Sequence, residues 1–143
     1  MEHGFVKVAA AIPSVRVADC IYNAAQLKEL IQKASEAGVQ LIAFPELSIT
    51  SYSCLDLFSG KLLLDQAEKT LLDLVHSTRD LQVLTVVGIP LRTENRLINA
   101  AVVFQQGHIL GVVPKTYLPN YKEFQEQRWF TSANDLQHDT IRI

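Results

Sequence analysis

Apolar residues in this chain gather either in short, nearly unbroken runs or in longer stretches with helical spacing. The runs at 5–12, 39–44 and 83–89 predict three buried strands, and the first and third are each followed by a Pro that is expected to end the strand. Between the runs, apolar positions recur every three or four residues, which predicts one helix over about 20–37 and another over about 61–79. The first third of the chain is therefore expected to be a strand–helix–strand unit whose strands pair in parallel.

Each predicted helix has one apolar stripe, and the first also has recognisable ends. Asp19 is placed to cap the first helix, and Gly38 suits the position just after its last turn. The residues expected to face the core are Ala24, Leu27, Ile31 and Ala34 in the first helix and Leu64, Ala67, Leu71, Leu74 and Val75 in the second.

The second half of the chain predicts a hairpin and two irregular segments. Apolar runs at 96–104 and 109–113 flank Gln105-Gln106-Gly107-His108, which suits a hairpin turn. The segments 47–60 and 116–135 have no apolar period and are expected to be loops with short pieces of helix. The resulting order, β-α-β-α-β-β-β, predicts an α/β domain with a mixed sheet.

The last residues predict a strand that has only begun. Ile141-Arg142-Ile143 starts an apolar alternation where the sequence stops. A strand cut at its start indicates a partial domain, with a frayed natural tail as the alternative.

Composition and charge narrow the class of protein. With 143 residues, 48% of them hydrophobic and 20% charged, the chain is long enough for one globular domain with a core. A formal net charge of −2 supplies no basic field for nucleic acid or for an anionic membrane. There is no signal-peptide pattern and no apolar run near the roughly 20 residues of a spanning helix, so the cytoplasm is the expected location.

The sequence predicts no metal or nucleotide site in this segment. No two of the four His residues have metal-ligand spacing, and neither Gly-x-Gly-x-x-Gly nor Gly-Lys-Ser/Thr occurs. Cys20 and Cys54 do not make a disulfide framework. Both are interpreted as packing residues, although the place of Cys20 at a helix N-terminus is one that can lower a thiol pKa.

Two charged residues follow predicted strands directly after a Pro. FPE at 44–46 and VPK at 113–115 each take the chain out of the sheet at its edge, where clefts form. Glu46 can act there as a general base, because desolvation beside apolar residues raises the pKa of a carboxyl group toward neutrality. Lys115 can stabilise negative charge that develops on a substrate oxygen. For both, a solvated surface charge is the alternative.

Three further residues follow these two charges at short intervals. Tyr52 is six residues after Glu46 and Tyr121 is six after Lys115, so both are candidates for the wall of a substrate pocket, with a plain packing role as the alternative. Glu123 is eight residues after Lys115 and can pair with it to hold it in place, unless it is simply solvated.

These residues resemble a known superfamily, the carbon–nitrogen hydrolases or nitrilase superfamily. The similarity lies in FPE at 44–46, PK at 114–115 and LPNYKEF at 118–124. The resemblance implies an α-β-β-α sandwich and a Glu-Lys-Cys triad, in which the Cys attacks an amide or nitrile carbon, the Glu carries the proton and the Lys stabilises the tetrahedral intermediate. It implies Glu46 as the base, Lys115 as the stabiliser and Glu123 as a supporting second carboxylate.

Two longer strings are similar to one branch of that superfamily, the glutaminase domains of glutamine-dependent NAD⁺ synthetases. They are LSITSYSCLDLF at 47–58 and YKEFQEQRWF at 121–130. The resemblance implies that Tyr52 and Tyr121 line a glutamine pocket. It also implies that the released ammonia serves ATP-dependent NAD⁺ synthesis from nicotinic acid adenine dinucleotide. ATP and Mg²⁺ would belong to a separate synthetase domain, and the intact enzyme would be a homo-oligomer.

One member of the implied triad is missing from these residues. In the family the nucleophilic Cys comes after the Lys, and here no Cys follows Cys54. The resemblance therefore implies that residues 1–143 are the N-terminal part of a glutaminase domain, without its C-terminal part or the synthetase domain. We expect this segment alone not to hydrolyse glutamine, and to expose apolar surface where the rest of the domain packs. Two alternatives stay open: another amidase or carbamoylase of the superfamily, and a non-catalytic α/β interaction module, in which Glu46 and Lys115 would lie far apart.

Overall fold

The computed structural model describes residues 4–93, 96–137, 140, 141 and 143. The elements in chain order are β1 (Val8–Ala10), α1 (Cys20–Glu36), β2 (Leu41–Ala43), the 3₁₀ segment η1 (Tyr52–Ser59), α2 (Lys61–Ser77), β3 (Leu84–Arg92), β4 (Leu97–Gln105), β5 (His108–Pro114), and the 3₁₀ turns η2 (Glu126–Arg128) and η3 (Ala133–Asp135).

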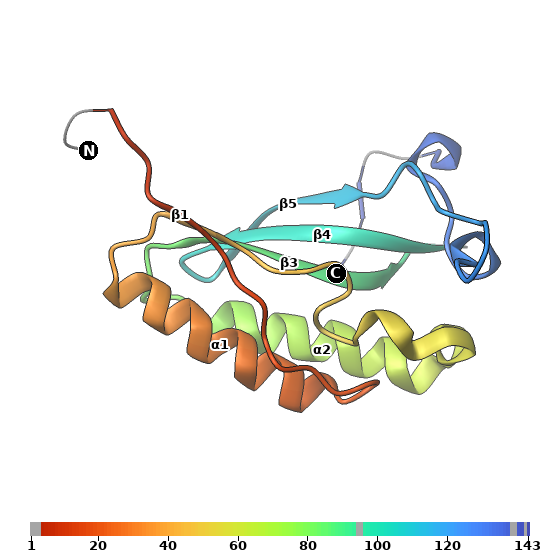
Figure 1. The fold of residues 1–143 in the computed structure, drawn as a ribbon, viewed down its shortest axis with the longest axis horizontal. Coiled ribbons are helices and arrows are strands. Elements are labelled where there is room, and N and C mark those ends of the chain that lie inside the picture. Colours follow the sequence, from red (N-terminus) through yellow and green to blue (C-terminus); the bar gives the residue numbers. More distant parts are fainter. Residues whose placement is uncertain (1–3, 94–95, 138–139, 142) are drawn as a thin grey trace.

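The five strands lie side by side in one mixed sheet, in the order in which they occur along the chain. β1, β2 and β3 pair in parallel, and β3, β4 and β5 pair antiparallel. Both α1 and α2 cover the same face of the sheet, which gives two layers, helix on sheet (Figure 1). The predicted element order and the mixed sheet are confirmed.

The helices begin and end close to the predicted residues. Asp19 caps α1, because its carboxylate accepts a hydrogen bond from the Tyr22 N–H at 3.1 Å. Gly38 follows the C-cap residue with φ +69°, a conformation that favours glycine. All nine side chains that were predicted to face the core are buried.

The core lies between the helices and the sheet. Alternate residues of the two long strands supply the sheet side of it, and the contacting rings of Phe58 and Phe130 also belong to it. The strand residues are Val87, Ile89 and Leu91 from β3 and Ile98, Ala100, Val102 and Phe104 from β4.

The predicted hairpin between β4 and β5 is confirmed. Its two turn residues, Gln106 and Gly107, have φ of 49° and 79°, and this pair of positive values matches the right-handed twist of the flanking strands. At the end of the chain, Ile141 and Ile143 lie in no regular element, and Arg142 lies outside the described residues.

The prediction that Pro90 ends the third strand is wrong. β3 continues through Pro90, which pairs with Asn99 of β4. The carbonyls of Val86 and Gly88 accept from Phe44 and Ile49, away from β4. Because backbone direction alternates along a strand, the missing N–H of Pro90 also faces away from β4, so it costs no bond of the β3–β4 ladder.

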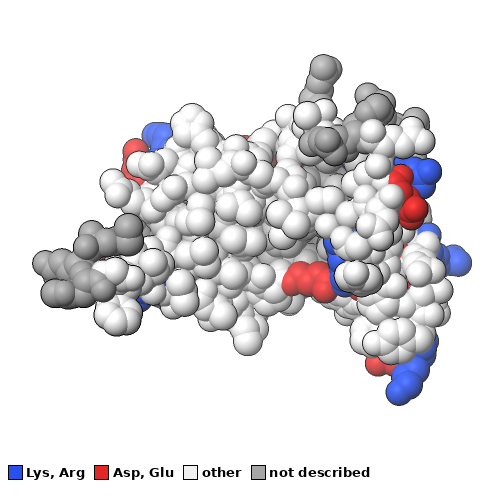
Figure 2. Space-filling view, turned by 90° about the horizontal axis from the view of Figure 1, so that it is seen from above, with Lys and Arg blue, Asp and Glu red and all other residues white. Residues whose placement is uncertain are grey.

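The prediction that the first strand is buried is also wrong, because β1 is an edge strand on a sheet with one open face. Phe5, Val8 and Ile12 are 82%, 63% and 88% exposed. On the same open face, β3 and β4 present Val86 and Val103, which alternate with the core positions. Figure 2 shows this face as a broad area almost without Lys, Arg, Asp or Glu.

The accessible area of the chain is large for its mass. It is 8769 Å² for a mass of 16.0 kDa. An average monomeric protein of this mass is expected to expose about 7,400 Å², so the excess is about 1,400 Å².

No helix among the described residues combines the length and the apolar composition that crossing a bilayer requires.

Candidate active site

Glu46 stands on the open face of the sheet, in a tight turn that follows β2. The turn is fastened to β3, because Ile49 N–H donates to the Gly88 carbonyl at 3.1 Å and Gly88 N–H donates to Ser48 Oγ at 3.3 Å. Leu47 adopts a left-handed φ of 52° to make the turn. The carboxylate of Glu46 is thus carried by a backbone that is held on both sides.

The turn can lie this close to β3 only because residue 88 is a glycine. A Cβ on Gly88 would lie 2.2 Å from Leu47 N and 2.8 Å from the carbonyl carbon of Glu46. Both distances are impossible for real atoms, so Gly88 sets the depth at which Glu46 sits.

Lys115 directly follows β5, as the sequence predicted. Its N–H donates to the Asn99 carbonyl at 2.8 Å, and its own carbonyl accepts from Ala133 N–H at 3.0 Å. The Lys115 backbone is therefore tied to β4 on one side and to the start of η3 on the other.

The structure brings Glu46 and Lys115 into direct contact. Lys115 Nζ lies 2.6 Å from Glu46 Oε1 and 2.9 Å from Glu126 Oε1. The side chain of Glu126 is only 2% exposed, whereas those of Lys115 and Glu46 are 28% and 39% exposed. The site thus has an ammonium between two carboxylates, one buried and one open to solvent, and the separation that the interaction-module alternative requires is not found.

The expected pairing of Glu123 with Lys115 is wrong, because Glu126 takes that place. Glu123 is exposed and forms no ion pair with any residue that the structure describes. Three residues later the chain enters η2, and the Glu126 N–H donates to the Pro119 carbonyl at 3.1 Å. That turn points the Glu126 side chain inward and leaves Glu123 outside.

Asn99 is a second site residue that the sequence prediction missed. It is 3% exposed, and its side-chain Nδ2 donates to Glu46 Oε1, the same oxygen that Lys115 contacts. A signal for it existed, because Asn99 is the one polar residue among the apolar residues 97–104 of β4. Glu126, between Gln125 and Gln127, offers no comparable signal.

Tyr52 and Tyr121 lie in the two loops beside this site. Tyr52 OH donates to Glu126 Oε1 at 2.8 Å. The Phe124 ring contacts both tyrosines edge-on, with ring centroids 6.4 Å from Tyr52 and 5.8 Å from Tyr121. Because Tyr121 is 63% exposed, these three aromatic side chains present an open surface next to the carboxylates.

The charges of the site shift two pKa values. Burial alone lowers the pKa of Lys115, but the hydrogen bonds to Glu46 and Glu126 outweigh it, so the pKa is raised above its ordinary value and the amine is charged at neutral pH. The pKa of Tyr52 is raised first by burial and then by its bond to Glu126, so the phenol keeps its proton. Glu126 Oε2 is buried and has no hydrogen-bond partner among the described residues.

Neither cysteine of the chain is an activated nucleophile. Cys20 and Cys54 are 1% and 2% exposed. Burial raises the pKa of Cys20 to about 11 and also raises that of Cys54, whose Sγ is directed at the Thr50 carbonyl at 3.1 Å. Both thiols are therefore protonated at neutral pH.

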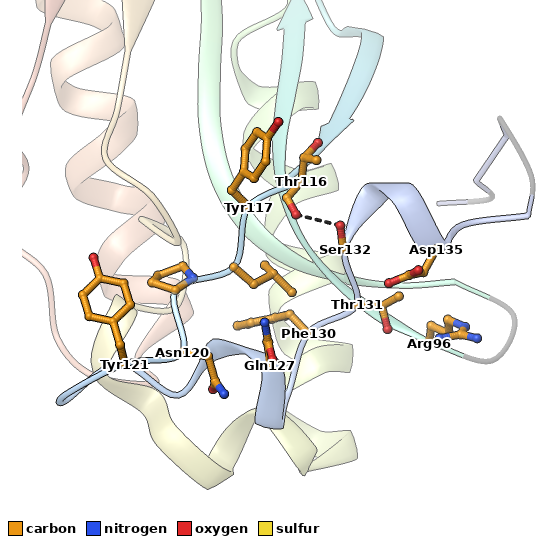
Figure 3. A pocket seen from close by; sticks show the side chains of 12 residues that line it. Arg96, Thr116, Tyr117, Asn120, Tyr121, Gln127, Phe130, Thr131, Ser132 and Asp135 are labelled. Carbon is orange, nitrogen blue, oxygen red and sulfur yellow. Dashed lines mark hydrogen bonds between the residues drawn. The ribbon is translucent and has the colours of Figure 1, made fainter.

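A hollow of about 860 Å³ is lined in part by the segment that follows Lys115 (Figure 3). Its lining residues include Tyr121, Asn120, Asp135 and Arg96. Two further lining residues are joined by a hydrogen bond, which Ser132 Oγ donates to the Thr116 carbonyl at 2.6 Å. Glu46, Lys115 and Glu126 are not among its lining residues, so we place the chemistry at the carboxylates and not in this hollow. Among the described residues, no three His, Cys, Asp or Glu side chains converge as they would to hold a metal ion.

The sequence of this chain is similar to one family throughout its length. A model of the carbon-nitrogen hydrolase family matches residues 7–141. The chain is 44% identical over 142 residues to a glutamine-dependent NAD(+) synthetase of Mycobacterium tuberculosis, covering 99% of this chain and 21% of that protein. It is 36% identical over 119 residues to the Aquifex aeolicus protein of the same name, covering 83% of this chain and 21% of that one. The chain thus spans about a fifth of the length of these curated relatives.

Solved structures show the same fold. A glutamine-dependent NAD(+) synthetase from Cytophaga hutchinsonii superposes with a TM-score of 0.83 at 26% identity, covering 89% of this chain and 22% of that one. An amidase from Nesterenkonia sp. superposes with a TM-score of 0.74 at 21% identity, covering 90% of this chain and 48% of that one, and this likeness concerns the fold alone. The predicted nitrilase-type α/β fold is therefore confirmed, and the chain belongs to the carbon–nitrogen hydrolase family.

Proposed function

We propose that this chain carries the base and the cation of a glutamine-hydrolysing site that feeds ammonia to NAD⁺ synthesis. The observation that supports it best is the contact of Lys115 Nζ with Glu46 and Glu126 at 2.6 and 2.9 Å. Glutamine as the substrate follows from the names of the relatives that match 83–99% of the chain.

The roles follow from the geometry. Glu46 is the solvent-accessible carboxylate and acts as the general base. Lys115 is held as a cation and stabilises the oxyanion of the tetrahedral intermediate. Glu126 is the buried second carboxylate that fixes the ammonium, the role first assigned to Glu123. Tyr52 and Tyr121 form a wall of the pocket for the amino-acid part of the substrate.

The nucleophile comes from polypeptide outside these 143 residues, because both thiols of the chain are buried and protonated. A Cys thiol passes its proton to Glu46, and the thiolate adds to the amide carbon. Glu46 returns the proton to the amide nitrogen as the C–N bond breaks, which releases ammonia and leaves a thioester. Water, deprotonated by Glu46, then cleaves the thioester to glutamate and restores the thiol.

The open face of the sheet is the surface on which the rest of the domain packs. Its apolar side chains and the excess of about 1,400 Å² of accessible area are what a sheet leaves open when its partner layer is absent. ATP and Mg²⁺ would bind in a synthetase domain elsewhere in the intact enzyme. Two free, buried cysteines agree with the reducing cytoplasm.

A chimera tests this function. The chain replaces the 142-residue region that it matches in the Mycobacterium tuberculosis relative, and ammonia release from glutamine is measured for the chimera and for the chain alone. We expect none from the chain alone, release by the chimera, and a loss of about a hundredfold or more in chimeras with Glu46→Gln or Lys115→Met. Release by the chain alone that Cys54→Ala abolishes, or a folded chimera without activity, would overturn the proposal.

The alternative within the family is an amidase or carbamoylase with another substrate. The chimera with Tyr121→Ala separates the two, because Tyr121 belongs to the pocket wall and does not touch the carboxylates. A loss for glutamine that simple amides and carbamoyl compounds do not show favours the glutaminase. Equal losses for all substrates favour the alternative.

A further inference from the structure

The loops that follow Glu46 and Lys115 are joined at a place that the proposed chemistry does not use. Arg128 Nε and Nη2 donate to the two carboxylate oxygens of Asp56, at 2.7 and 3.1 Å. Trp129 Nε1 donates to Asp56 Oδ1 at 2.9 Å. We call Asp56, Arg128 and Trp129 the loop clasp.

Aromatic packing holds the Trp129 ring of the loop clasp in place. The ring of Phe58 is 1% exposed, and its centroid lies 5.9 Å from that of Trp129 and 5.0 Å from that of Phe130. The indole thus reaches Asp56 from a buried aromatic base. The side chains of Arg128 and Asp56 are 59% and 68% exposed, and two parallel bonds to one carboxylate hold the guanidinium there. The three donated bonds also lower the pKa of Asp56 to about 2, first through Arg128 and then through Trp129.

The backbone from Ser51 to Asp56 is strained. Leu55 has φ 50° and ψ −131°, a region that only glycine enters easily, and Ser51 has φ 74°. Leu55 is 62% exposed, so its own side chain does not impose this conformation. Such strain persists where contacts on either side hold the chain, and here those contacts are Tyr52 with Glu126 and Asp56 with Arg128.

The loop clasp and the Tyr52–Glu126 hydrogen bond of the active site both connect η1 to the η2 loop. Tyr52 lies four residues before Asp56 in η1, and Glu126 lies two residues before Arg128 in η2. A shift of η1 against η2 would therefore move Tyr52 away from Glu126 Oε1, from which it now lies 2.8 Å. Glu126 would lose a bond that directs it toward Lys115.

We propose that Asp56 is a positioning residue: it clasps Arg128 and Trp129 and so holds Glu126, through Tyr52, against the ammonium of Lys115. This inference rests on the proposed function, in which Glu126 fixes Lys115. Asp56 touches neither the base nor the ammonium and has no step in the reaction.

The test uses the 143-residue chain and needs no catalysis, so it can fail while the proposed function stands. Asp56→Asn removes the charge, and Arg128→Lys keeps the charge but cannot donate two parallel bonds. Asp73→Asn is the matched control, because Asp73 is an exposed acid on α2 that forms no ion pair with any described residue. Trp129 is the single tryptophan of the chain, so its indole N–H is one resolved NMR signal. The second readout is the pKa of Lys115, from the chemical shift of the side-chain carbon next to Nζ.

In both clasp variants we expect the indole N–H to exchange with solvent about tenfold faster or more. In Asp56→Asn its acceptor loses the charge, and in Arg128→Lys Asp56 loses the paired bonds that hold it against the indole. We also expect the pKa of Lys115 to fall toward its ordinary value in both, and neither readout to change in the control. A merely structural role would lower the unfolding temperature and leave the pKa of Lys115 in place, which would overturn the proposal. A fall of that pKa with Asp56→Asn but not with Arg128→Lys would overturn it too, since loss of charge alone would then explain the result.

Discussion

The buried side-chain amide of Asn99 donates a hydrogen bond to the carboxylate of Glu46. The same residue accepts the backbone N–H of Lys115 through its carbonyl, at 2.8 Å. One position near the start of β4 therefore sets both the orientation of the proposed base and the place of the proposed cation. Glu46 and Lys115 are 69 residues apart in sequence. Because both are bonded to the same residue of a rigid strand, their charged groups are held 2.6 Å apart.

Gly88→Ala should be the most damaging small substitution near the site. Its Cβ would lie 2.2 Å from Leu47 N, so the turn that carries Glu46 must move. We expect a loss of about 1–3 kcal/mol in the free energy of unfolding, measured by denaturant titration. Gly111→Ala is the matched control, because nothing lies within 4 Å of its Cβ. Equal effects of the two substitutions would contradict the close approach.

Glu126→Gln should change how stability depends on alkaline pH. A group whose pKa is raised by folding stabilises the protein below its unfolded pKa, and that stability is lost as the pH rises through the folded pKa. For Lys115 the loss therefore begins near pH 10.5, its ordinary value, and Tyr52, whose pKa is also raised, acts in the same direction.

Because Glu126 contributes to both shifts, the decrease in unfolding free energy between about pH 9 and 11.5 should be smaller in Glu126→Gln than in the wild type. Glu123→Gln provides the comparison, since Glu123 lies outside the ion-pair cluster. A curve for Glu123→Gln that changes as much as that for Glu126→Gln would show that Lys115 is not held by Glu126.

Leu55→Gly should stabilise the chain by up to about 1 kcal/mol, although glycine in most positions destabilises. The reason is that Leu55 has φ 50° and an exposed side chain, so the change relieves strain and removes little buried surface. Leu57→Gly, at a similarly exposed position without positive φ, should destabilise by about the same amount. Thermal melting of both variants decides the matter, and two losses of equal size would speak against strain in η1.

The open sheet face should make the isolated chain bind anilinonaphthalene sulfonate and self-associate. Its exposed apolar residues include Val8 and Val113, at 63% and 60%. A Val8→Lys, Val113→Lys double variant should bind less dye and stay monomeric in light scattering. A wild-type chain that is monomeric and binds no dye would contradict an uncovered face.

The sequence predicts most of the fold because local patterns determine it. The stripe of α1, its cap at Asp19 and its end at Gly38 are all read from residues within one element, and the hairpin turn at Gly107 follows the same logic. The two errors in the strands have non-local causes. The burial of β1 depends on whether a second layer covers the sheet, and Pro90 is tolerated because its nitrogen faces away from β4.

The two charges of the site were predicted because each leaves the end of a strand, whereas Asn99 inside β4 gave a signal that was missed. Glu46 and Lys115 both follow a Pro at a strand end, and the structure joins them. Glu126 is buried by contacts with Tyr52 and Lys115, which are 74 and 11 residues away, and nothing in its neighbourhood distinguishes it from Glu123. An apolar or polar pattern cannot report which of two nearby acids a tertiary contact will bury.

The most direct test compares those two acids in the chimera with the Mycobacterium tuberculosis relative, by the rate of ammonia release from glutamine. If Lys115 works between Glu46 and Glu126, Glu126→Gln should lower kcat/KM by about a hundredfold or more, and Glu123→Gln should leave it within about twofold. A large loss with Glu123→Gln and a normal rate with Glu126→Gln would contradict the arrangement described for this site.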